Sequence, residues 1–238
     1  MSETTTVDAR NPRLPGSYEE LAKIIELPLI SSELSEEQVA QGCETARQYG
    51  MASVIVRPSD VDLAERWTRS AFVLGAVIDW PHGFSTTAVK QYAARDALRR
   101  GAKEITVAIN TGKLVSRQFQ YLEMELIQIA EACHEISALL TVSLESGYLN
   151  DEHKIVACRI SKRVSADFIA TPEPSDIALF REHGKGRIQI KLRGAGTLDA
   201  ALSAFDAGCS RLETVHGAEI LDAWKARLTA EAEATAEK

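Results

Sequence analysis

Short apolar runs alternate with amphipathic segments along most of the chain. The apolar runs are rich in β-branched residues and bounded by polar turn residues, as parallel strands buried on both faces are. Seven of them are clear, at residues 52–56, 71–78, 104–109, 139–145, 167–170, 188–192 and 210–215, and a weaker run lies at 24–30. The segments between these runs carry apolar residues at helical spacing. The pattern therefore predicts alternating strands and helices almost from end to end.

Capping signals mark where several of the predicted helices begin and end. Ser35 and Gln38 form a capping box, and Gly50 is suited to close that helix. Residues 85–101 begin on hydroxyl residues and end in two arginines, whose charges complement the helix dipole, and a glycine. The remaining predicted helices are residues 114–136 as one long amphipathic helix, a helix capped by Asn150, helices beginning at Ser175 and Thr197, and residues 217–234.

The number and spacing of these elements predict the fold class. Eight strands, each followed by a helix at intervals of roughly twenty to thirty-five residues, are what a (β/α)8 TIM barrel needs. We expect a single α/β domain of this class over residues 17–230, between a flexible leader at 1–16 and a frayed acidic tail at 231–238. The alternative is an open doubly wound sheet, but no GxGxxG motif follows a strand, no P-loop occurs, and the GAGT string at 194–197 is not a dinucleotide fingerprint.

Composition narrows the class of protein without changing the fold. The 238 residues are 45% hydrophobic and 26% charged, which suits one globular domain. A formal net charge of −7 argues against nucleic acid or an anionic membrane as a partner. No apolar run approaches the roughly 18 residues of a membrane span, and the polar N-terminal segment is unlike a signal peptide. The 4 cysteines are scattered with no CxxC pair, so we expect buried reduced thiols in a cytoplasmic protein.

Polar residues stand at the predicted C-terminal ends of the strands, where a barrel builds its active site. They are Glu26, Arg57, Asp79, His82, Asn110, Glu145, Thr171, Glu173, Lys191, Arg193, Glu213 and His216. Asp79 and His82 flank Pro81, and two interpretations stay open for them: residues of the site, or residues that only organise a loop. Glu145 lies among turn residues whose amides can hold it, and His216 stands at a helix start. No pair has a recognised metal spacing, so we predict neither a metal nor a cofactor.

Lys191 differs from these residues because it lies inside an apolar strand. In the run IQIKL, alternation places Gln189 and Lys191 on the face opposite the isoleucines, and in a barrel that face points into the pore. A buried ammonium group costs free energy unless it is paired or used. Two interpretations stay open at this point: a functional amine, or a salt bridge to a carboxylate in the pore.

Five stretches resemble the deoxyribose-phosphate aldolases in order and spacing. They are YGMASVIVRP from residue 49, WPHGFSTTAVKQYAARDAL from 80, GAKEITVAINTGKL from 101, LLTVSLESGYLNDEHKIVACRISKRVSADFI from 139, and IKLRGAGTLDAALSAFDAGCSRLET from 190. The resemblance covers nearly all of residues 19–222, including loop strings that barrel packing does not dictate. It implies a (β/α)8 barrel and a class I aldolase ancestor. Such enzymes join acetaldehyde to glyceraldehyde 3-phosphate through a lysine Schiff base, without a metal, and many are homodimers.

The functional residues of that family carry over poorly. Ala170 stands where the family's sixth strand ends in KTSTG, whose lysine forms the Schiff base. Thr106 stands at the position of the proton-shuttling aspartate, and Thr141 at that of the fifth-strand lysine. Glu26, Pro28 and Ile55 also replace family residues. Of the charged centre only Lys191 matches, as the family's second lysine, which makes it the one catalytic candidate.

The phosphate site implied by the resemblance is altered as well. The glycine-rich loop after the sixth strand is deleted, and the loop after the seventh is one residue shorter. Val215 and His216 replace the paired serines near the last helix. These changes weaken a phosphate ligand without excluding it. The predicted substrate-binding residues are Asn110, Thr141, Glu145, Arg193, Gly194, Gly196, His216 and Gly217, of which Asn110 and Glu145 match family positions.

The sequence therefore predicts that ordinary cleavage of deoxyribose 5-phosphate is absent or weak. Schiff-base catalysis needs a neutral amine; desolvation would lower the pKa of Lys191, whereas a nearby Glu145 would raise it.

Three hypotheses about the function remain. The first is a divergent carbon–carbon lyase or other carbonyl-processing enzyme, a homodimer acting on a small aldehyde or sugar, phosphorylated or not. The second is a non-catalytic relative that binds a metabolite or a protein. The third is a structural partner of a true aldolase.

Overall fold

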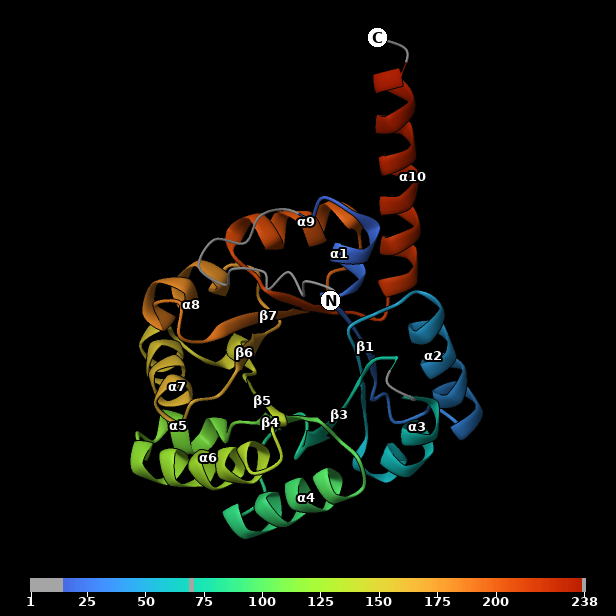
Figure 1. Ribbon diagram of the computed structural model, residues 1–238. Helices are drawn as coiled ribbons and strands as arrows, with labels where there is room; N and C mark the ends of the chain where they lie inside the picture. Colours follow the sequence, from blue (N-terminus) through green and yellow to red (C-terminus); the bar gives the residue numbers. More distant parts are fainter. Residues whose placement is uncertain (1–14, 69–70, 237–238) are drawn as a thin grey trace.

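Eight parallel strands close into a barrel in the order β1 to β8 (Figure 1). The computed structural model describes residues 15–68 and 71–236. The strands are β1 Ile25–Leu29, β2 Ser53–Val56, β3 Val73–Ile78, β4 Glu104–Ala108, β5 Leu139–Ser143, β6 Phe168–Thr171, β7 Gln189–Arg193 and β8 Arg211–Glu213. All eight predicted strands are present, and the predicted single-domain (β/α)8 TIM barrel is confirmed.

Helices lie on the outside of the barrel and connect its strands (Figure 1). They are α1 Tyr18–Ala22, α2 Glu36–Gln48, α3 Val61–Thr68, α4 Thr87–Arg99, α5 Thr111–Val115, α6 Phe119–His134, α7 Asp151–Arg163, α8 Asp176–Gly184, α9 Leu198–Ala207 and α10 Gly217–Ala236. The capping box of α2 is confirmed, because Ser35 and Gln38 each accept a hydrogen bond from the other's backbone amide. Within the described residues, no helix is both long and apolar enough to cross a membrane.

The prediction of one helix over residues 114–136 is wrong. Helix α5 ends at Val115 and α6 begins at Phe119. Between them Arg117 has a φ of 57°, a left-handed conformation that an α-helix of L-residues cannot continue through. The apolar pattern did not reveal the break because no glycine or proline marks it.

The predicted flexible leader and frayed acidic tail lie at the two ends of the chain. Most of the predicted leader, residues 1–14, lies outside the described residues. Helix α10 continues to Ala236, so the predicted acidic tail at 231–238 is helical over most of its length. The last part of α10 projects away from the barrel (Figure 1).

The two faces of the barrel sheet differ in chemistry. The outward face carries fully buried aliphatic side chains such as Val54, Ile105 and Val142, which belong to the main hydrophobic core. The inward face carries polar residues that are at most 2% exposed: Glu26, Ser53, Glu104, Thr106, Thr141, Ser143 and Lys191. Because buried polar groups cost free energy unless they are paired, this inward face is the part of the fold that needs a functional explanation.

The cysteines belong to the packing of the fold. All four, Cys43, Cys133, Cys158 and Cys209, are buried and free, as predicted. Burial raises the pKa of the Cys133 and Cys209 thiols to about 12. Thiols of that kind are protonated and unreactive near neutral pH.

Candidate active site

Four charged side chains from four different strands meet inside the pore. The Lys191 Nζ lies 2.5 Å from Glu26 Oε2 and 2.6 Å from Glu104 Oε1. The Arg211 Nη1 lies 2.5 Å from Glu26 Oε1 and 3.1 Å from Glu104 Oε2. We call these four residues the ionic cluster. Two cations and two carboxylates alternate in it, so the buried charge is balanced.

The surroundings of the ionic cluster hold its charges in place. Lys191, Glu26 and Glu104 are fully buried. The Thr141 hydroxyl donates a hydrogen bond of 2.9 Å to Glu104 Oε1. The ring of Phe168 faces both cations, at 5.1 Å from Lys191 Nζ and 4.7 Å from the Arg211 guanidinium. Each cation is therefore fixed by carboxylates and by an aromatic face.

The ionic cluster keeps Lys191 protonated. Burial alone lowers the pKa of the Lys191 amine, but the carboxylates of Glu104 and Glu26 outweigh it and raise that pKa above its ordinary value. Burial likewise raises the pKa of Glu104, and the charges of Lys191 and Arg211 outweigh it, so that this pKa is lowered. Of the two interpretations of Lys191, the geometry supports the salt bridge. The partners are Glu26 and Glu104, whereas Glu145 pairs with Arg193.

Glu213 lies in the pore beyond the ionic cluster, at the C-terminal end of β8. Its Cα pairs with Arg193 on one side and with Glu26 on the other. Burial raises the pKa of its carboxyl to about 7, against the opposing effect of Lys191 and Arg193, while Glu26 and Glu104 raise it further. Its carboxylate has no hydrogen bond to any residue in the described part of the chain. A carboxyl group in this state exchanges a proton near neutral pH.

Arg193 lies across the C-terminal mouth of the pore. From β7, its Nη2 donates to the Leu144 carbonyl at 2.9 Å and to Glu145 Oε1 at 3.1 Å, both just beyond β5. Its guanidinium also stacks on the Trp80 ring beyond β3, at 4.5 Å. Its Nε is buried and has no partner among the described residues.

Besides the Ser53 hydroxyl on β2 and Glu26 Oε2, which is ion-paired with Lys191, two further polar groups in the pore have no hydrogen-bond partner in residues 15–68 and 71–236. They are the hydroxyls of Thr106 on β4 and Ser143 on β5. Ser143 pairs in register with Ala170, which pairs with Lys191. We call Thr106, Ser143, Ala170, Arg193 and Glu213 the upper pore site. Its unpartnered hydroxyls and guanidinium Nε suit a small ligand with carbonyl or hydroxyl oxygens.

Other residues predicted from the strand ends have structural contacts. Asn110 caps α5 by accepting from the Lys113 amide at 3.0 Å. Asp79 accepts from the amide and hydroxyl of Ser85, at 2.6 and 2.7 Å, and so organises its loop. The Thr171 hydroxyl donates to Asp176 at 2.8 Å. Each of these side chains already makes hydrogen bonds within the protein, which supports a structural role for it.

The predicted glycines and the histidine lie around β7 and β8, beside the pore mouth. The Gly194 amide donates to the Glu213 carbonyl at 2.8 Å and has a φ of 96°. His216 is exposed, and Gly217 lies tightly against Ile25, where a Cβ would come within 2.9 Å. Gly217 is therefore explained by packing.

An aromatic pocket of about 320 Å³ lies beside the pore mouth. Its lining is His82, Phe84, Thr111, Gly112, Glu145 and Tyr148. The His82 and Phe84 rings stack at 4.9 Å, and Phe84 and Tyr148 are more than 70% exposed. Across the described residues, no group of three or more His, Cys, Asp or Glu side chains is arranged to hold a metal ion.

Proteins of known family are similar in sequence to this chain over most of its length. No family model matches the chain. A deoxyribose-phosphate aldolase of Treponema denticola is 34% identical over 212 residues, which are 85% of this chain and 98% of the relative. The chain belongs to the deoxyribose-phosphate aldolase family. A second family member, from Caldanaerobacter subterraneus, is 32% identical over 216 residues, 86% of this chain and 94% of its own.

Solved structures agree with membership in the deoxyribose-phosphate aldolase family. The aldolase QR15 has a TM-score of 0.82 at 29% identity, over 87% of this chain and 96% of its own. A deoxyribose phosphate aldolase from Aeropyrum pernix, described as a unique tetramer, has a TM-score of 0.81 at 23% identity, over 94% of this chain and 99% of its own. At 23% identity, the similarity to the Aeropyrum pernix protein shows a common fold and nothing further.

Two charged residues in the pore of this protein were not predicted from the sequence. Glu104 and Arg211 complete the ionic cluster, and neither was singled out. A signal existed for Glu104, because it alternates with Thr106 in the same apolar run. Arg211 opens its strand, at the end of the barrel opposite the expected site, and gave no such signal.

Proposed function

We propose that this chain processes the carbonyl group of a small aldehyde or sugar without forming a lysine imine. Its membership in the deoxyribose-phosphate aldolase family supports carbonyl chemistry as the class. The observation that carries the proposal is the position of Lys191 between the carboxylates of Glu26 and Glu104. In this proposal, cleavage of deoxyribose 5-phosphate is weak or absent.

An imine requires a neutral amine. An unperturbed lysine is neutral in roughly one molecule in 2,500 at pH 7, and the raised pKa of Lys191 makes its neutral fraction smaller still. Ala170, which the resemblance aligns with the family's nucleophile, has no group to substitute. Both facts support a reaction that does not pass through Lys191.

Glu213 supplies the acid–base group of the proposed reaction. As a carboxylate it removes the proton from the carbon next to the substrate's carbonyl. The C–H bond breaks, its electron pair forms an enolate, and the proton moves to Glu213. Arg193, close enough to lower the pKa of Glu213, stabilises the enolate oxygen. The hydroxyls of Thr106 and Ser143 hold the remaining oxygens.

Solvent exchange tests this proposal. Glyceraldehyde, dihydroxyacetone and deoxyribose are incubated with the protein in D2O, and loss of the proton next to the carbonyl is followed by NMR. We expect catalysed exchange with at least one of them, and a loss of roughly 100-fold or more in Glu213→Gln, the range for a general base. Exchange at the same rate in the variant, or with none of the substrates, would overturn the proposal.

A second candidate is a non-catalytic ligand-binding member of the family. It is favoured by the guanidinium of Arg193, which already lies across the pore mouth on Leu144, Glu145 and Trp80. A rise in melting temperature with a sugar or aldehyde, without exchange or turnover, would select it.

We also propose that the chain is a cytoplasmic homodimer. The Aeropyrum pernix protein, which shares the fold, is described as a tetramer, so a barrel of this shape is able to self-associate. Sedimentation at twice the mass of one chain is expected, and a monomer at micromolar concentration would contradict it.

A further inference from the structure

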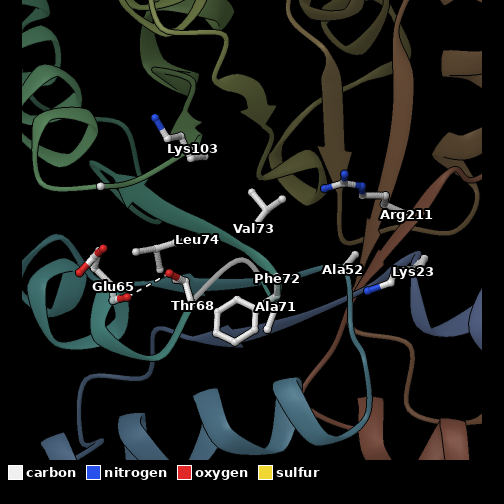
Figure 2. Close-up of a pocket in the computed structure, with 11 residues that line it drawn as sticks. Lys23, Ala52, Glu65, Thr68, Ala71, Phe72, Val73, Leu74, Lys103 and Arg211 are labelled. Atoms are coloured by element: carbon white, nitrogen blue, oxygen red, sulfur yellow. Dashed lines mark hydrogen bonds between the residues drawn. The ribbon is translucent and has the colours of Figure 1, made fainter. Parts of the chain in front are cut away.

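A second pocket of about 650 Å³ lies at the opposite end of the barrel from the upper pore site. Figure 2 shows its lining, which includes Lys23, Ala52, Glu65, Phe72, Lys103 and Arg211. Lys23, Ala52, Phe72 and Lys103 each stand just before a strand, and Arg211 is the first residue of β8. The pocket therefore lies on the N-terminal face of the barrel, and we call it the N-terminal pocket.

The cations of the N-terminal pocket are available to a ligand. Neither Lys23 nor Lys103 has an ion pair or side-chain hydrogen bond with another described residue. Arg211 is held through its Nη1 by Glu26 and Glu104, while its side chain remains 17% exposed. A guanidinium anchored on one nitrogen presents its other N–H groups without first losing rotational freedom.

The rest of the lining selects among anions. Ala71 and Val73 are partly exposed and give one wall an apolar surface, next to the buried Phe72 and Leu74 (Figure 2). Glu65 adds a negative charge, and the carboxylates of the ionic cluster already balance Arg211. The remaining excess of positive charge is small, which suits a ligand with one or two charges and an apolar body.

We propose that the N-terminal pocket binds a small organic anion, a carboxylate or phosphate monoester attached to an apolar group. The charged end lies against Lys23, Lys103 and Arg211, and the apolar body lies on Ala71 and Val73. This site is separate from the upper pore site and does not depend on the proposed reaction.

The test uses phenyl phosphate and benzoate as probes, titrated into the full-length protein and followed by NMR of backbone amides. We expect shifts for residues 71–74 and 103. The double variant Lys23→Gln/Lys103→Gln should weaken the probe that binds more tightly by at least tenfold. The stronger probe identifies whether the charged group is carboxylate or phosphate. Inorganic phosphate, which lacks the apolar body, should bind at least tenfold more weakly than phenyl phosphate.

Lys185→Gln is the matched control. Lys185 lines a different basic groove, with Arg159, Lys162, Arg163 and Arg187, so it reports nonspecific attraction of anions. Its removal should leave probe affinity unchanged. Wild-type affinity in the double variant, equal weakening by Lys185→Gln, or shifts confined to residues 159–187 would each overturn the proposal. Both exchanged lysines in the double variant are exposed, so the fold is retained.

Discussion

Lys191 is fixed by the charges around it more than by its place in the strand. Its ammonium is fully buried, and a buried charge costs free energy unless opposite charges compensate for it, as Glu26 and Glu104 do here. The Nζ–Oε1 distance of 2.6 Å to Glu104 is that of a strong, charge-assisted hydrogen bond, and Glu26 Oε2, at 2.5 Å from the Nζ, adds an ion pair. A residue held in this way orders the inner pore, and in the proposed reaction the chemistry is left to Glu213 and Arg193 beyond it.

Glu104→Gln tests the importance of the ionic cluster. It leaves the buried Lys191 and the partly exposed Arg211 with a single carboxylate, and breaking a buried pair costs about 3–5 kcal/mol of the free energy of unfolding. Urea denaturation measures this loss. Glu152→Gln is the control, because the pair of Glu152 with Arg117 is on the surface and contributes about 0–1 kcal/mol. Equal effects of the two substitutions would show that the ionic cluster adds no stability.

Glu213 makes stability depend on pH in a predictable direction. Its folded pKa of about 7 lies above the ordinary value of 4.5, so its contribution to stability is complete below pH 4.5 and is lost as the pH rises through 7. Glu213→Gln removes that loss. Relative to the wild type, the variant should gain about 3 kcal/mol of unfolding free energy between pH 4.5 and pH 8, from the size of the pKa shift. A difference between the two proteins that stays constant with pH would refute the assignment.

At the residue scale, the sequence predicted which way Lys191 points but not what it contacts. Alternation along IQIKL was enough to place it in the pore. Glu104 lies 87 residues away in the chain, and Glu26 is on β1. Lys191, Glu104 and Glu26 come together only because the barrel closes and because its strands pair in one register. Neither the closure nor the register can be read from a local sequence pattern.

At the element scale, Ser35→Ala tests the capping that the sequence predicted for α2. The substitution removes one half of the capping box and should cost about 1 kcal/mol of unfolding free energy. Ser175→Ala is the control, since Ser175 precedes α8 without a side-chain capping bond. It should cost much less in the same denaturation experiment. Similar losses would show that the capping box does not stabilise α2.

The elements were predictable where local chemistry decides them. Strands stood out because both of their faces are buried, and the starts of α2, α7 and α9 because a side chain caps each of them. The hydroxyl residues predicted to cap α4 and α8 make no side-chain capping bond at Thr86 and Ser175. The break between α5 and α6 was not predictable, because Arg117 adopts a left-handed backbone that its residue type does not favour.

At the scale of the whole molecule, the barrel separates two kinds of site. The upper pore site at the C-terminal ends of the strands is where TIM barrels carry out chemistry. The N-terminal pocket lies at the other end, and the ionic cluster lies in the pore between them. The count of eight strand–helix units predicted the barrel, and the resemblance predicted the family. The sequence did not predict the N-terminal pocket, because its residues lie at the strand starts, whereas a TIM barrel builds its active site at the strand ends.

The central claim is that Lys191 is a paired ammonium and not an imine-forming amine. Reduction with borohydride in the presence of acetaldehyde or deoxyribose 5-phosphate, followed by peptide mass spectrometry, tests it directly. A reduced adduct forms only where a lysine has formed an imine with the carbonyl compound. We predict no adduct on the peptide that contains Lys191. A stoichiometric adduct on Lys191 would contradict the account.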